Sequence, residues 1–72
     1  MARCDYLLSK ELFEKDASFA ALIMAAMRKA DSSNLARLKE AWPEIWKELE
    51  ARYNARGGWL SGEINDDGER VL

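Results

Sequence analysis

The chain has 72 residues, which is room for one domain near the lower size at which a single apolar core holds a fold without disulfides or metals. Its 49% hydrophobic and 33% charged residues are typical of a globular, helix-rich protein rather than a disordered one. The net charge of −2 gives no overall positive field that would attract nucleic acid. The absence of histidine excludes His-based catalysis and His-containing zinc sites, and the single cysteine excludes an all-Cys zinc site and an intrachain disulfide.

The N-terminal residues are charged and lack the apolar run of a signal peptide, so secretion is not expected. Residues 5–15 place Leu8, Leu12 and Phe13 at helical spacing, with Asp5 as a candidate cap. This pattern predicts a short first helix. The single cysteine, Cys4, cannot form an intrachain disulfide and is typical of a protein of a reducing cytosol.

Nine consecutive apolar residues, Phe19 to Met27, form the most hydrophobic part of the chain. The run is about half the length that crosses a bilayer and has charges on both sides, so it predicts a buried central helix to about Ala30, begun by Asp16 or Ser18, and no membrane anchor. A helix that is apolar all round must be covered all round, and three short companion helices cover only part of it. We therefore expect a second copy or a partner to cover the rest, with a candidate oligomer interface of Phe19, Ile23, Met24 and Met27.

Polar residues from Asp31 to Asn34 predict a turn and the start of a third helix. Its apolar stripe is Leu35, Leu38 and Trp42. Pro43 breaks the pattern, and the sequence leaves open whether a separate helix or a kinked continuation follows. The fourth helix is predicted from Pro43 to about Asn54, before Gly57-Gly58, with a Glu48–Arg52 pair on one face and an apolar opposite face of Ile45, Trp46, Leu49 and Tyr53.

The C-terminal part is predicted as an acidic tail of residues 63–72 after a helical domain of residues 1–62, with a turn or small hairpin at Asp66-Asp67-Gly68. Alternate oxygen side chains, beginning at Glu63, mimic the first half of a calcium loop, but the closing glutamate would fall beyond Leu72. We expect an acidic turn here and no metal ion or cofactor.

The charged residues point to binding rather than catalysis. Glu44 and Glu48, one turn apart, are typical of a solvated helix face, and no phosphate-binding glycine loop is present. Trp59 either folds back on the helices or forms an exposed anchor. In the second case, the residues around it are candidate partner contacts, namely Arg52, Tyr53, Arg56, Trp59 and Leu60. Arg28 and Lys29 are candidate anion contacts.

The blocks LIMAAMRKAD, LKEAWPEIWKEL and ARYNARGGWLSGE lie within residues 5–63. Through them the chain resembles a family of small hypothetical proteins encoded by bacteriophages and prophages, in which a proline often stands at the position of Ser18. The resemblance implies a viral protein in the host cytoplasm and no particular activity. The acidic tail lies outside it.

Taken together, these observations predict an all-α domain, a small bundle of three to four helices with a central apolar helix and an irregular tail. The favoured function is a noncatalytic protein-binding module that modulates a host protein, for example as an inhibitor of host defence. The alternative is a homo-oligomer, either a structural phage component or a sponge that holds a small anionic ligand between subunits. No enzymatic activity is expected.

Overall fold

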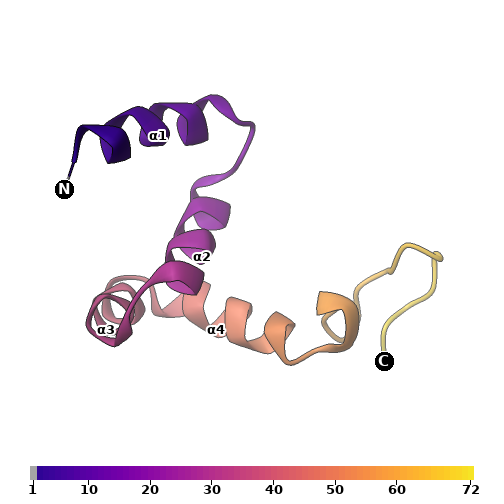
Figure 1. Ribbon diagram of the computed structural model, residues 1–72. Coiled ribbons are helices and arrows are strands. Elements are labelled where there is room, and N and C mark those ends of the chain that lie inside the picture. The colour runs from indigo at the N-terminus through magenta and orange to yellow at the C-terminus, as the bar shows by residue number, and fades with distance from the viewer. Residues whose placement is uncertain (1) are drawn as a thin grey trace.

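The computed structural model describes residues 2–72 and is all-helical (Figure 1). Its elements, in chain order, are α1 (Arg3–Glu14), α2 (Phe19–Lys29), α3 (Ser32–Ala41), α4 (Pro43–Tyr53) and the 3-10 turn η1 (Arg56–Gly58). The predicted fold class, a small helical bundle with an irregular C-terminal part, is confirmed.

The core lies where α2, α3 and α4 meet, since each of these helices packs against the other two. Two side chains in the described chain are buried, Met27 of α2 at 3% exposure and Leu49 of α4 at 6%. Around them lie half-buried apolar side chains from all three helices, namely Leu22, Ile23, Met24, Leu35, Leu38, Ile45 and Trp46. The apolar α2 therefore supplies one side of a core that α2, α3 and α4 share.

Side-chain caps begin α2 and α3. The hydroxyl of Ser18 accepts a hydrogen bond from the N–H of Ala21 at 3.0 Å, and the carboxylate of Asp31 accepts one from the N–H of Asn34 at 2.8 Å. Each cap satisfies a backbone donor that has no partner inside its helix. The first helix differs from the prediction, because α1 begins at Arg3 and Asp5 caps it from inside the first turn by accepting the N–H of Ala2.

Pro43 divides two separate helices, which answers the question that the sequence left open. Trp42 leaves helical geometry, with φ −133° and ψ 65°, and Pro43 then occupies the first position of α4. Proline suits that position because it has no N–H to leave unpaired. The ring of Trp42 meets Phe19 edge to face at 5.7 Å, which links the α3–α4 corner to the start of α2.

The C-terminal segment folds back as a small loop beyond α4 (Figure 1). The helix ends at Tyr53, before the two glycines, and Gly57 and Gly58 then turn the chain with positive φ angles of 64° and 74° that favour glycine. Ile64 and Arg70 form a single antiparallel β-bridge around the Asp66–Gly68 turn. The turn that the sequence predicts is present.

The first helix is set apart from the other three. Within residues 2–72, α1 packs against no other helix, and Lys15 and Ser18 are in extended conformations that carry it away from α2. The molecule is consequently elongated, 46 × 27 × 16 Å, with a radius of gyration of 15.0 Å. A compact domain of this length has a radius of gyration of about 11 Å.

Candidate binding surface

An apolar pocket of about 220 Å³ opens between α2, α3 and α4. Its floor is made by the buried Met27 and Leu49, and its walls by Leu35 and Trp46. Arg28, Glu50, Tyr53 and Asn54 complete the lining. A recess of this size and character accepts an apolar side chain.

Two residues of the pocket lining carry the features of a binding anchor. Tyr53 is 75% exposed, and the guanidinium carbon of Arg28 lies 6.0 Å from the centre of its ring. Among the described residues no carboxylate is within ion-pair distance of Arg28. Tyrosine and arginine beside an apolar recess are the residue types that dominate binding energy in protein interfaces.

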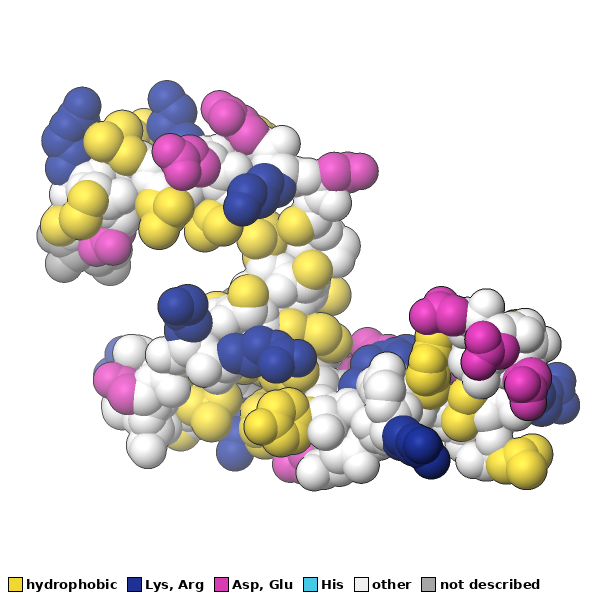
Figure 2. All heavy atoms as spheres, turned by 45° about the vertical axis from the view of Figure 1, so that its right-hand side comes forward, with side chains coloured by type: hydrophobic (Ala, Val, Ile, Leu, Met, Phe, Trp, Pro, Cys, Tyr) yellow, Lys and Arg dark blue, Asp and Glu magenta, His cyan; other side chains and the backbone are white. Residues whose placement is uncertain are grey.

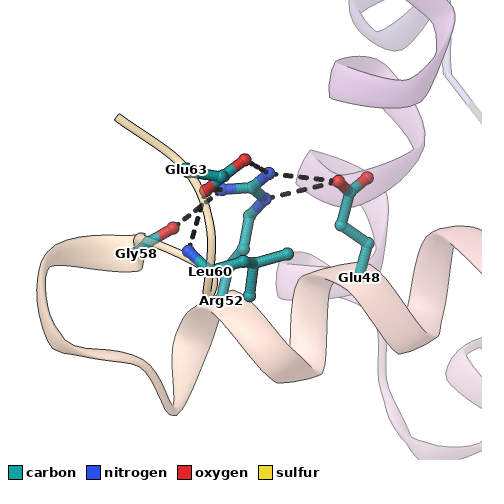
Figure 3. A network of polar contacts seen from close by, with 5 residues as sticks. All are labelled: Glu48, Arg52, Gly58, Leu60 and Glu63. Carbon is teal, nitrogen blue, oxygen red and sulfur yellow. Dashed lines mark hydrogen bonds and ion pairs between the residues drawn. The ribbon is translucent and has the colours of Figure 1, made fainter. Parts of the chain in front are cut away.

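Arg52, in contrast, is occupied by contacts within the chain (Figure 3). Its guanidinium donates two hydrogen bonds to the carboxylate of Glu63, at 2.9 and 2.7 Å, and one to the carbonyl oxygen of Gly58 at 2.8 Å. It also pairs with Glu48 at 3.3 Å, which confirms the predicted pair one turn away on α4. The bidentate contact between Arg52 and Glu63 holds the segment after α4 against the helix.

Arg52 and Glu63 stabilise each other's ionised forms. The hydrogen bonds from Arg52, and secondly the N–H of Leu60 at 2.7 Å, lower the pKa of Glu63 below its ordinary value of 4.5. The same carboxylate raises the pKa of Arg52. Glu63 therefore belongs, by its contacts, with α4 and the turn after it.

The five residues predicted to contact a partner are not brought together on one exposed surface. Arg52 is bound to Glu63, and Trp59 and Leu60 are half-buried. Tyr53 and Arg56 are exposed, but Tyr53 lines the apolar pocket, whereas Arg56 and Trp59 line a separate hollow together with Asn65, Asp67 and Val71. Trp59 is therefore half-buried, and the hollow that it lines is shared with the C-terminal loop.

The four residues predicted for an oligomer interface are also distributed between core and surface. Phe19 is 60% exposed, Ile23 and Met24 are half-buried, and Met27 is in the core. Of the two predicted anion contacts, Arg28 lies at the apolar pocket and Lys29 at a different hollow beside Asn34 and Arg37.

The sequence did not indicate the apolar pocket. Leu35, Trp46 and Leu49 appear in their helices as ordinary core positions, and a gap between three helices has no local pattern. The spacing of Tyr53 on the apolar face of α4 was the one available signal, since a tyrosine at the end of such a face often reaches the surface.

Among residues 2–72, no group of three or more acidic or cysteine side chains is placed to hold a metal ion, and no helix has the length and apolar character needed to cross a membrane. The side-chain oxygen of Asn65, part of the calcium-like pattern, accepts the N–H groups of Asp67 and Glu69 within the turn. Comparisons of the chain with protein-family models, with curated proteins and with solved structures found no match.

Proposed function

We propose that the chain is a small noncatalytic protein-binding module and that the pocket between α2, α3 and α4 is its binding site. The proposal depends on the position of two residues beside the apolar pocket. Tyr53 is exposed there, and Arg28 lies next to its ring and makes no ion pair among the described residues. The partner inserts a large apolar side chain into the pocket and places a carboxylate near Arg28, because that guanidinium is the unpaired cation there.

The resemblance to phage and prophage proteins supports a viral setting for this module. The partner is then a protein of the bacterial host, met in the host cytoplasm, and the module acts by occupying a surface that the host protein needs. Inhibition of a defence protein is one form of this action. A pocket that accepts one side chain supports binding to the surface of a partner protein rather than catalysis of a reaction on that partner.

The test is a pull-down from host lysate with the wild-type chain and with Tyr53→Ala. We expect a host protein to be enriched by the wild type and its affinity to fall about 30-fold or more with Tyr53→Ala, the loss typical of a central aromatic anchor. Arg28→Glu should weaken binding as well, since it places a negative charge against the partner's carboxylate.

Ile64→Ala is the matched control, because Ile64 is 56% exposed and lies in the C-terminal loop, outside the pocket lining. The proposal fails if no host protein is enriched, or if the Tyr53→Ala chain retains the partner as well as the Ile64→Ala chain does.

A further inference from the structure

Within residues 2–72, the apolar side chains of α1 are covered by no other helix. Figure 2 shows hydrophobic side chains along the side of α1 that faces the open space between this helix and α2. Leu7, Leu8 and Leu12 are 43%, 52% and 41% exposed, and Phe13 is 83% exposed. A helix of 12 residues is only marginally stable in water by itself, so α1 requires a surface to pack on.

The area that the chain leaves exposed measures how much cover is missing. The described chain exposes 6300 Å², whereas a folded monomer of 8.2 kDa exposes roughly 4,500 Å². The surplus of about 1,800 Å² is about twice the 800 Å² that one partner buries in a protein interface of standard size. The surplus belongs to the whole elongated chain, of which α1, the helix that packs on no other helix of residues 2–72, is one part.

We infer that this chain forms a homodimer in which α1 of one copy packs against α1 of the other through the face of Leu7, Leu8 and Leu12. A second copy is the occupant that fits, because it is present wherever the chain is made and brings an equal uncovered helix. In a two-fold dimer each α1 supplies the cover that the other lacks, with the same patch used on both subunits. This inference does not depend on the pocket between α2, α3 and α4.

Sedimentation equilibrium of the full chain over a range of concentrations tests the dimer. We expect twice the monomer mass of 8.2 kDa for the wild type. Leu8→Glu should raise the dissociation constant at least about 30-fold, because it buries a carboxylate in an apolar interface. Since α1 packs on no other helix, this variant should keep the tryptophan fluorescence of the α2–α4 core.

Leu72→Glu is the matched control, with the same chemical change at a fully exposed residue far from α1 in the chain. It should remain dimeric, as should Tyr53→Ala, so that failure of the dimer and failure of the pocket are separate results. Hydrogen exchange should show α1 protected in the wild-type dimer and unprotected in Leu8→Glu.

Three results would overturn the inference. The first is a wild-type chain that is monomeric at every concentration. This includes a monomer in which α1 folds back on its own chain and its amides are therefore protected. The second is equal behaviour of Leu8→Glu and Leu72→Glu. The third is an α1 that becomes protected only when a host protein is added, which would assign this face to a different partner.

Discussion

At the scale of single residues, Arg52 shows how one side chain joins two parts of the chain. The pair with Glu48 follows from helical spacing and could be predicted. The bond to Glu63 crosses eleven positions and a glycine turn, so no periodic pattern indicates it. A residue that the sequence assigns to an acidic tail therefore fixes the start of that segment against α4.

The lowered pKa of Glu63 makes this attachment dependent on pH. Because ionised Glu63 is favoured in the attached state, its contribution is complete above the ordinary pKa of 4.5 and is lost as the pH falls through the lowered value. We expect the protection factors of residues 59–71 against hydrogen exchange, each taken relative to the intrinsic rate at the same pH, to fall below about pH 4.5. Glu63→Gln should show the lower protection factors already at pH 7.

Glu69→Gln is the control for this change, because the side chain of Glu69 is exposed and makes no ion pair among the described residues. Its exchange should match the wild type at neutral pH. If Glu63→Gln also matched the wild type, the carboxylate would not be what holds the segment.

At the scale of the elements, the helix boundaries follow from local chemistry. Ser18, Asp31 and Pro43 each begin a helix by satisfying or removing a backbone donor, and these starts could be predicted within one or two residues. The end of α4 near Asn54 was also predicted within one residue, but its cause was not. Asn54 ends it by donating its side-chain N–H to the carbonyl of Glu50, so Gly57 and Gly58 turn the chain only after the helix has stopped.

The cap of α3 can be tested with two substitutions at one position. Asp31→Ala leaves the N–H of Asn34 without its partner and should lower the free energy of unfolding by about 1 kcal/mol in urea denaturation. Asp31→Asn keeps an oxygen at the same place and should cost only a few tenths of a kcal/mol. Equal losses for the two variants would mean that the hydrogen bond is not what stabilises the start of α3.

At the scale of the whole molecule, the core is small. Two buried side chains of the described residues, with half-buried neighbours, hold α2, α3 and α4 together. Domains of this size rarely have more than about 3–5 kcal/mol of stability. Lys39 adds cover, because its ammonium nitrogen lies 4.2 Å from the centre of the Trp46 ring.

Leu49→Ala should therefore abolish cooperative unfolding. Truncating a buried leucine costs about 2–5 kcal/mol, which equals most or all of the stability available to such a chain. Thermal denaturation followed by circular dichroism should show a sharp transition for the wild type and a shallow slope for the variant. Leu72→Ala, at a fully exposed position, should keep the wild-type transition; a cooperative Leu49→Ala transition near the wild-type temperature would contradict this view of the core.

The sequence left open whether Pro43 separates two helices, but it was sufficient to predict the all-α fold class and the Glu48–Arg52 pair. Each of these depends on neighbours within about four residues, and helical periodicity and proline geometry act over that distance.

Which apolar faces meet depends on the tertiary structure. In the structure, α1 lies apart from the helices that its leucines could have covered, and a pocket opens beside Tyr53. Met27, which the sequence suggested for an oligomer interface, lies in the core. An apolar pattern shows that a face must be covered, but the angles between helices, set by a few turn residues such as Lys15 and Trp42, determine what covers it.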